Sequence, residues 1–323
     1  MMNNSKIQEK LRADAALLLE QGQVQFFVGF ENGSLKFSTT PLITSSEEDV
    51  HRLVLNPFIV NNLSVYLPDF KRGKTGIVVK GCDSRSLVSL LQDNQIKRED
   101  LFILGVPCSG VIDIKKIEKL VHKDRDKIDD ITISGDNVVV VVRGDKEEFP
   151  LTNAVRDNCL SCEYPVPEEY DVLLDGTGIL NADIATGRKE LDALANKTPE
   201  ERWKFWKNEF YRCIRCYACR SVCPACYCEQ CFTEESEPRW IAPMPRWQDN
   251  LFFQTIRNIH VSGRCTDCGE CEHACPVNIP LRSLAKEMCD DVSDLYDFHA
   301  GIDKDTEPMM THYDSNDPED FIR

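Results

Sequence analysis

Two segments of the chain repeat one cysteine pattern, and this repeat constrains the fold more than any other feature of the sequence. Both segments read C-x2-C-x2-C-x3-C-P. Their members are Cys213, Cys216, Cys219, Cys223 and Pro224 in the first run, and Cys265, Cys268, Cys271, Cys275 and Pro276 in the second. Three thiolates separated by two residues wrap one face of an iron–sulfur cube in a tight loop, while the fourth lies past a turn. The repeat therefore predicts two 4Fe-4S sites in one module.

The spacing is that of bacterial two-cluster ferredoxins, in which the fourth cysteine of each run ligates the cluster of the other run. The predicted ligand sets are Cys213, Cys216 and Cys219 with Cys275, and Cys265, Cys268 and Cys271 with Cys223. A pair of zinc sites is the alternative, but zinc motifs usually stop at two cysteines per knuckle. The 41 residues between Cys223 and Cys265 exceed what a minimal ferredoxin uses, which predicts an insertion between the runs.

The composition narrows the class of protein further. Sixteen cysteines would also suit a secreted disulfide scaffold, but a chain of 323 residues needs no such staples and its cysteines form C-x2-C groups. No apolar stretch follows the N-terminal charges and none reaches 18 residues, so neither a signal peptide nor a membrane span is expected. The formal net charge of -16 disfavours nucleic acid as a partner. We expect a cytoplasmic protein of an anaerobe, because exposed clusters are oxygen-labile.

The first half of the chain reads as an α/β domain. After a helix over residues 5–20 and a strand, a buried strand ends at Cys82 and an amphipathic helix follows with Asp83 as its N-cap. A second buried strand ends at Cys108, and another amphipathic helix covers 113–123. Strand, helix, strand and helix at this spacing form a βαβ pattern, which predicts a parallel sheet with right-handed crossovers.

The rest of the chain divides where its composition changes. A hairpin is expected over 131–143, and a linker helix begins with a capping box of Thr198 and Glu201, with Pro199 at its first position. We expect an α/β (α+β) N-terminal domain with a mainly parallel sheet, a dicluster ferredoxin-like module and an acidic tail. The expected ranges are 1–185 for the first domain, 186–212 for the linker helix, 213–289 for the ferredoxin module and 290–323 for the tail.

Four further cysteines lie in the N-terminal half. Cys82 and Cys108 each end a strand of the same sheet, and one βαβ step brings both ends to the edge where open α/β sheets bind ligands. Cys159 and Cys162 add a C-x2-C pair from a loop. These four thiols would complete a third 4Fe-4S site, whereas the alternative for Cys82 and Cys108 is a pair of buried core thiols.

These stretches resemble the beta subunit family of coenzyme F420-reducing hydrogenases and F420-dependent formate dehydrogenases. The resemblance rests on VVKGCDSR, LGVPCSGV and CLSCEYP, followed by YDVLLDGTG, and covers roughly residues 10–180. It implies an iron–sulfur flavoprotein in which the four cysteines hold one cluster and FAD is also bound. Joined to a dicluster module, the arrangement is most similar to the formate dehydrogenase beta subunits. The hydrogenase members carry a Ser/Gly-rich stretch against the flavin, where this chain reads KLRADAALLLEQG, so use of the deazaflavin stays open.

Four residues are candidates for contact with the flavin. Gly176 and Gly178 lie where the family has a Gly turn beside its flavin, with an ordinary turn as the alternative. Lys80 and Arg85 flank Cys82 and would raise a cluster potential or bind a flavin phosphate, with solvation at the surface as the alternative. No catalytic residue is predicted, because the sequence shows no Ser-His-Asp set, H-E-x-x-H motif or Walker loop.

The remaining cysteines form a surplus that the three predicted clusters do not use. These are Cys226, Cys228, Cys231 and Cys289. A fourth cluster or a zinc ion would use all four thiols. Otherwise they are packed thiols, or Cys228 and Cys231 replace Cys82 and Cys108 beside the C-x2-C pair.

Three clusters and FAD in one chain would form an electron relay. Clusters carry single electrons, whereas a flavin accepts two and releases one. We expect a subunit that links a two-electron carrier, such as coenzyme F420, to a molybdenum or tungsten formate dehydrogenase subunit, a hydrogenase or heterodisulfide-reductase-like subunits. Two alternatives stay open: a flavin-free ferredoxin-like adaptor whose N-terminal domain is a docking scaffold, and an independent enzyme such as a ferredoxin-dependent flavin reductase.

Overall fold

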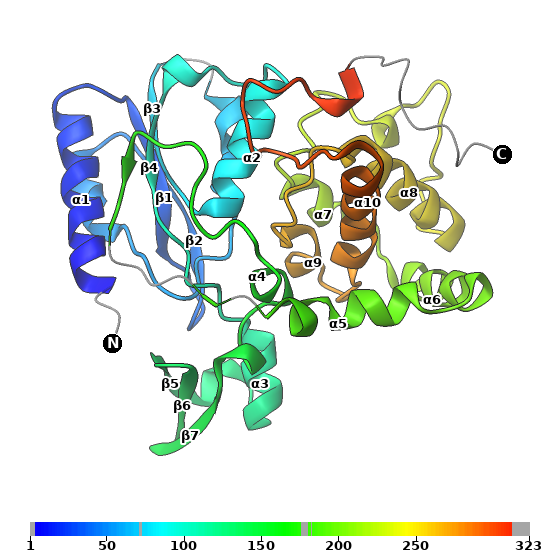
Figure 1. The fold of residues 1–323 in the computed structure, drawn as a ribbon, viewed down its shortest axis with the longest axis horizontal. Coiled ribbons are helices and arrows are strands. Elements are labelled where there is room, and N and C mark those ends of the chain that lie inside the picture. The colour runs from blue at the N-terminus through cyan, green and yellow to red at the C-terminus, as the bar shows by residue number, and fades with distance from the viewer. Residues whose placement is uncertain (1–3, 71–72, 176–179, 182, 312–323) are drawn as a thin grey trace. The chain divides into compact units, whose positions relative to one another are not determined.

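The computed structural model describes residues 4–70, 73–175, 180–181 and 183–311 (Figure 1). The chain forms two compact units. The first comprises Met1–Leu63, Asp69–Ser84 and Lys97–Arg188, and the second comprises Ser64–Pro68, Arg85–Ile96 and Lys189–Arg323. Two short segments from the N-terminal half thus belong to the second unit. The sequence-based division, with one boundary at residue 185, did not predict this exchange.

A five-stranded sheet forms the centre of the first unit, in the order β2-β1-β3-β4-β8. Only the β1–β2 pair is antiparallel, so the prediction of a mainly parallel sheet is confirmed. Val79 pairs with Gly105 at the carboxyl ends of β3 and β4, which therefore meet at one edge. The strands are β1 (Phe26–Asn32), β2 (Thr39–Thr44), β3 (Thr75–Val79), β4 (Leu101–Gly105) and β8 (Val172–Leu173).

The helices of this half of the chain follow the expected order, with one correction at α2. Asp83 is the third residue of α2 and not its N-cap, because the helix already begins at Gly81. Its carboxylate accepts the backbone N–H of Lys80 at 3.1 Å, as the acidic residue of a capping box does. Figure 1 shows α1 alongside the sheet. The helices are α1 (Asn4–Glu20), α2 (Gly81–Gln92), α3 (Ile114–Val121), α4 (Asp157–Leu160) and α5 (Ile184–Ala195).

A second, antiparallel sheet packs on α3 in the first unit. It comprises β5 (Ile128–Ser134), β6 (Asn137–Val142) and β7 (Asp145–Pro150) in that order. The predicted hairpin is confirmed as β5–β6, while β7 was not predicted. Its sequence, DKEEFP, is almost wholly exposed and shows no apolar alternation. The apolar face of β6 and α3 supplies the core of this subdomain.

Helices dominate the second unit. The predicted capping box of Thr198 and Glu201 is confirmed at the start of α6. The helix α10 continues to Tyr296, so residues 290–296 are helical and not part of an acidic tail. No helix in the described part of the chain is long and apolar enough to cross a membrane. The helices are α6 (Pro199–Arg212), α7 (Ala218–Ser221), α8 (Trp247–Val261), α9 (Glu270–His273) and α10 (Leu281–Tyr296).

The apolar core of the second unit is built around the cysteine runs. Phe210 and Phe253 are buried together with Cys219 and Cys275. Tyr217 packs edge-on against Phe253, with ring centroids 5.1 Å apart.

Short 3-10 helices complete the two units: η1 (Glu47–Arg52), η2 (Leu63–Asp69), η3 (Arg98–Asp100), η4 (Arg125–Lys127), η5 (Leu151–Asn153), η6 (Phe232–Glu234) and η7 (Met309–Thr311).

Candidate iron–sulfur centres

The two ferredoxin-type runs follow the same backbone path. Two residues after the first cysteine of each run, Arg215 and Asp267 both have φ of 53°. Two residues further on, Tyr217 and Gly269 have φ of 60° and 72°. Left-handed residues at matching positions curl each C-x2-C-x2-C segment into a tight loop. A one-turn helix then follows in both runs, α7 in the first and α9 in the second.

The fourth cysteine of each run leaves its loop through the same turn. The backbone N–H of Cys223 donates to the carbonyl of Arg220 at 3.2 Å, and that of Cys275 donates to Glu272 at 3.1 Å. Each fourth cysteine therefore lies beyond the loop that holds the other three, as crossed ligation requires.

The first run receives its fourth thiol from the second run. Burial raises the pKa of the Cys213 thiol, and the nearby thiols of Cys219, Cys275 and Cys216 raise it further. All four cysteines line one small cavity. The backbone N–H of Ile279 donates to the sulfur of Cys275 at 3.4 Å. Four thiols around a small cavity, with a backbone donor aimed at one sulfur, fit a thiolate-bound cluster.

The second run in turn receives Cys223. Burial raises the pKa of Cys268, and the neighbouring charges of Glu270, Cys223 and Cys265 add to the rise. Burial likewise raises the pKa of Cys271, again with Cys223 and Cys265 among its neighbours. The structure thus brings Cys223 to the second run and Cys275 to the first, which is the crossed pattern expected from the spacing.

The four cysteines of the first unit meet at the carboxyl edge of its parallel sheet. Cys82 lies three residues after β3 and Cys108 three residues after β4. Burial, with the Cys159 thiol as the next cause, raises the pKa of Cys108 to about 12, and Cys162 contributes to the rise. Lys80 lies near both Cys82 and Cys108. The structure therefore gathers both strand-end thiols and the C-x2-C pair at one edge.

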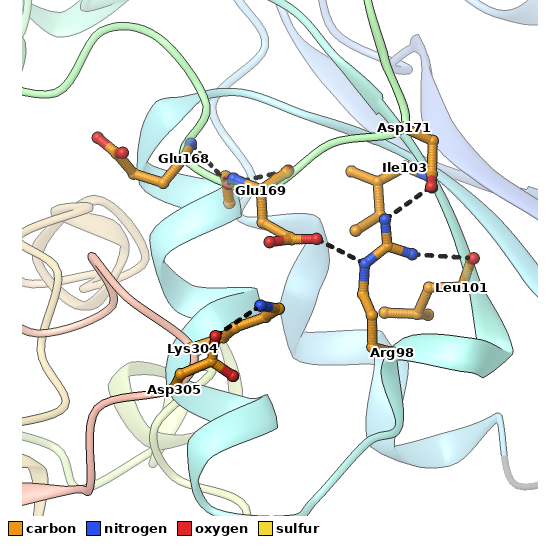
Figure 2. A network of polar contacts seen from close by, with 9 residues as sticks. Arg98, Leu101, Ile103, Glu168, Glu169, Asp171, Lys304 and Asp305 are labelled. Atoms are coloured by element: carbon orange, nitrogen blue, oxygen red, sulfur yellow. Dashed lines mark hydrogen bonds and ion pairs between the residues drawn. The ribbon is translucent and has the colours of Figure 1, made fainter.

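The loop that follows the C-x2-C pair is fixed against the strand ends. The backbone N–H of Cys108 donates to the carbonyl of Pro165 at 2.8 Å. A side chain at Gly81 would place its Cβ 1.9 Å from the carbonyl oxygen of Tyr164, so only glycine lets this loop approach α2. Further along, the Arg98 guanidinium forms ion pairs of 2.7 Å with Glu169 and Asp171 (Figure 2). These contacts hold the second pair of thiols near the first.

Of the two basic residues that flank Cys82, neither is simply solvated at the surface. Lys80 is only 2% exposed, and its ammonium forms a 2.8 Å ion pair with Asp83 and donates to the carbonyl of Asn61 at 3.0 Å. Burial lowers the pKa of Lys80, but the Asp83 carboxylate and the nearby thiols raise it more, so the side chain stays charged. Arg85 belongs to the second unit, where its guanidinium donates twice to the carbonyl of Ala300.

The candidate flavin glycines, Gly176 and Gly178, lie outside the residues that the structure describes. A small cavity lies beside Cys108. Its wall includes Lys80, Cys108 and Asn56.

The four surplus cysteines are divided among different neighbours. The Cys226 thiol hydrogen-bonds with Cys223, which lowers the pKa of the Cys223 thiol. The thiol of Cys289 donates to the carbonyl of Cys265 at 3.4 Å, while Cys228 is exposed. Within the described ranges, no three His, Cys, Asp or Glu side chains are arranged to hold a single metal ion. The fourth cluster or zinc ion at this set stays a prediction, and two of its members, Cys226 and Cys289, accompany proposed ligands of the second run.

One group of polar residues near the clusters was not predicted from the sequence. The helix α8 lies in the insertion between the two runs and buries four polar side chains at helical spacing: Asn250, Gln254, Arg257 and Asn258. No signal in the sequence indicated this burial, because polar residues at intervals of three and four normally mark the solvent-exposed face of a helix. The 41-residue spacing alone indicated an insertion but not its content.

Two family models match adjoining parts of the chain. Residues 73–188 match the C-terminal model of the coenzyme F420 hydrogenase/dehydrogenase beta subunit, which covers all four N-terminal thiols. Residues 186–279 match a 4Fe-4S dicluster domain, which covers both ferredoxin-type runs.

Curated relatives and a solved structure carry related names. The chain is 27% identical to the F420-dependent formate dehydrogenase subunit beta of Methanocaldococcus jannaschii, over 77% of this chain and 78% of that protein. It is 23% identical to the F420-dependent formate dehydrogenase 1 subunit beta of Methanococcus maripaludis, over 91% and 90%. A chain of the F420-reducing [NiFe] hydrogenase complex of Methanosarcina barkeri aligns with a TM-score of 0.39 at 16% identity, over 66% of this chain and 91% of that chain. The two family models and the formate dehydrogenase relatives together support the expected resemblance: the chain is similar to the coenzyme F420 hydrogenase/dehydrogenase beta subunit family, with a 4Fe-4S dicluster domain joined to it.

Proposed function

We propose that this iron–sulfur protein is the electron-transfer subunit of a formate dehydrogenase or hydrogenase complex and that it carries three 4Fe-4S clusters. One observation supports this most directly: twelve cysteines form three groups of four, two groups in the second unit and one at the sheet edge of the first. A 4Fe-4S cluster supplies reversible one-electron transfer. The proposed ligands are the two crossed sets of the dicluster domain and the set of Cys82, Cys108, Cys159 and Cys162.

The residues around each group fit a thiolate-bound cluster. Buried thiols with no countercharge would be costly to ionise, and iron supplies the positive charge that makes thiolate the stable form. Backbone amides and side-chain amides point at sulfur atoms in the dicluster domain, as with Ile279 toward Cys275 and Gln254 toward Cys219. Such donors are the usual second layer of contacts around cluster ligands.

We further propose that FAD binds in the first unit, in the cavity beside Cys108. The support is the family resemblance together with the position of this cavity, whose wall holds both a cluster thiol and the charged Lys80. A flavin supplies the exchange between two-electron and one-electron chemistry that a hydride carrier needs. Lys80 is held by Asp83 and Asn61, so its role would be to set the local charge and not to move onto a phosphate.

The proposed partner is a catalytic subunit that performs the primary two-electron chemistry. The curated relatives are named as beta subunits of F420-dependent formate dehydrogenases, which supports formate chemistry in the partner and F420 as the carrier. The sequence carries no pterin-site signature, so formate oxidation is assigned to this partner. Heterodisulfide-reductase-like subunits are the other proposed partners, and copurification of the native complex distinguishes them from a formate dehydrogenase.

Iron and flavin content test the proposal. The anaerobically purified chain should hold about twelve irons, because three clusters contain four each. Cys108→Ala should lower this to about eight and remove one EPR signal. Cys228→Ala is the matched control, since Cys228 is exposed and belongs to no predicted ligand set, and it should leave the iron content unchanged.

Two outcomes would contradict parts of this proposal. A wild-type chain with about eight irons would overturn the third cluster. Three clusters without FAD would favour the flavin-free adaptor, in which the first unit serves partner docking. In that case Cys108→Ala would alter binding of the partner but not the flavin content, since there would be none.

A further inference from the structure

The insertion helix α8 turns a buried polar face toward both ferredoxin-type sites. Asn250 donates to the carbonyl of Cys213 at 2.8 Å, and Gln254 donates to the sulfur of Cys219 at 3.5 Å. Arg257, one turn further along, is 4% exposed and donates to the carbonyl of Cys219 at 3.1 Å. A minimal ferredoxin with a shorter spacing has no room for such a helix between its runs.

Arg257 is a buried cation whose neighbours are thiols. The sulfur groups nearest to it electrostatically are those of Cys223 and Cys271, followed by Cys226 and Cys219. Two of these, Cys223 and Cys271, belong to the proposed ligand set of the second run, while Cys219 belongs to that of the first. The side chain therefore lies near the ligands of both proposed clusters. Its strongest electrostatic interactions with thiols are with ligands of the second.

The guanidinium has a carbonyl and thiols as its partners and not a carboxylate. Its Nη2 atom donates to the carbonyl of Cys219, and the side chain also interacts with the thiols of Cys223 and Cys226. Its Nε and Nη1 atoms are buried and make no hydrogen bond of good geometry among the described residues. No ion pair with a carboxylate is found for it there either, although most arginines of the second unit have one, such as Arg264 with Asp93. A buried cation without a carboxylate partner is strongly unfavourable, so Arg257 favours anionic sulfur beside it. The same cation helps to lower the pKa of the Cys223 thiol.

A thiolate-bound 4Fe-4S cluster is itself anionic, and two of them would supply that charge. Arginine cannot lose its proton at accessible pH, so its charge is fixed. Reduction of a cluster adds one electron without forming a bond or moving a proton. A fixed cation beside the cluster therefore stabilises the reduced state more than the oxidised state.

We propose that Arg257 is a shared positioning residue that raises the reduction potential of both ferredoxin-type clusters, and more strongly that of the cluster held by Cys265, Cys268, Cys271 and Cys223. This inference rests on the proposed function, because it requires both clusters to be present. It assigns a role to the insertion: α8 brings one cation to two electron-carrying sites and raises the potential of one above that of the other. The guanidinium contacts the loops that carry the cluster ligands. Its effect on electron transfer would therefore come from the reduction potentials of the clusters.

The test is an EPR-monitored redox titration of the full chain, purified anaerobically, with dithionite as reductant. Arg257→Gln should keep the full iron content and lower the midpoint potential of at least one cluster. The expected shift is tenfold or more in the one-electron reduction equilibrium, which is about 59 mV. Arg257→Lys keeps the charge and should shift the equilibrium by much less. Arg246→Gln is the matched control, since Arg246 lies at the start of the same helix with a largely exposed side chain, and it should change nothing.

The outcomes separate this inference from the proposed function. Loss of both clusters in the wild-type chain would refute the proposed function before any potential is measured. A fully loaded Arg257→Gln chain with unchanged potentials would overturn the inference alone. If Arg257→Gln does not load iron, Arg257→Lys decides between the two roles. A loaded Arg257→Lys chain with near-native midpoint potentials supports a role for the positive charge. A tenfold or larger fall in the one-electron reduction equilibrium of this variant overturns the inference. If neither variant loads, the side chain serves cluster assembly and the inference is also overturned.

Discussion

Lys80→Met is the substitution whose cost the structure predicts most directly. Lys80 and Asp83 form an ion pair of 2.8 Å in which the two side chains are 3% and 0% exposed. Methionine replaces the aliphatic stem of lysine but not its charge. The variant would leave the Asp83 carboxylate buried, with the backbone N–H of residue 80 as its chief donor. Removing one partner of a buried pair costs about 3–5 kcal/mol, and we expect a loss in this range.

The cost should depend on pH. Burial raises the pKa of the Asp83 carboxyl, and the charge of Lys80 opposes this rise. Lys80→Met removes the positive charge that opposes the rise. The folded-state pKa of the Asp83 carboxyl therefore lies further above its unfolded value of about 3.9. A carboxyl with a raised folded-state pKa adds stability only while protonated, and that stability is lost as the pH rises through the raised pKa. Because one pKa unit is worth about 1.4 kcal/mol, the variant should be less destabilised near pH 5 than near pH 8 by roughly 1–2 kcal/mol.

Hydrogen exchange of β3 and β4 peptides at increasing urea is the appropriate assay. All four tryptophans, Trp203, Trp206, Trp240 and Trp247, lie in the second unit, so their fluorescence does not report on the first. Lys10→Met is the matched control, because the Lys10–Asp14 pair is an exposed i,i+4 pair of the same unit and should cost under about 0.5 kcal/mol.

A double-mutant cycle gives the refuting result. Asp83→Asn in the Lys80→Met background removes the stranded charge, so the double variant should be more stable than Lys80→Met alone. If the double variant is no better, and if the cost of Lys80→Met is the same near pH 5 and near pH 8, the buried carboxylate is not the source of the loss.

Three other predictions follow from local geometry. Gly81→Ala places a Cβ 1.9 Å from the Tyr164 carbonyl, so it should displace the loop beside Cys108 and reduce iron content by about one cluster, whereas the open Gly22→Ala should not. Thr198→Ala removes the capping-box acceptor of α6 and should cost about 1 kcal/mol, measured by tryptophan fluorescence in urea. The raised pKa of Cys108, about 12, predicts that in the iron-free chain its alkylation stays slow up to alkaline pH while exposed Cys228 reacts readily, as mass spectrometry of labelled peptides would show.

The dicluster repeat and the parallel sheet could be predicted because each leaves a short-range pattern. The cysteine spacing fixes the path of a loop, and buried β-strands with an intervening helix fix a crossover. Cys82 and Cys108 could be brought together from the sequence for the same reason, since the ends of neighbouring parallel strands must meet. The ligands of a site can be predicted from the sequence when a strand, a helix or a tight loop fixes their relative positions.

Other features depend on contacts that no local pattern encodes. Lys80 was as consistent with a solvated surface residue as with a buried one, because its partner Asp83 also suited a helix N-cap. The strand β7 has no apolar face, and its pairing with β6 comes from the backbone alone. The role of Arg85 depends on Ala300, more than two hundred residues away. The burial of the Lys80–Asp83 pair and the distant contact of Arg85 with Ala300 were therefore the part that the sequence did not predict.

Crossed ligation links the two dicluster sites energetically, and the insertion between the runs works with this link. Each proposed site takes three thiols from one run and one from the other, so a cluster at either site holds the runs together and favours binding at the other. The buried core of Phe210 and Phe253 with Cys219 and Cys275 already supplies much of that ordering. The charge of Arg257 would be less favourable when both sites lack a cluster and more favourable when both hold one. On the proposed role of Arg257, the same cation would destabilise the module without clusters relative to the loaded one, so α8 would couple the occupancy of the two sites as well as their potentials.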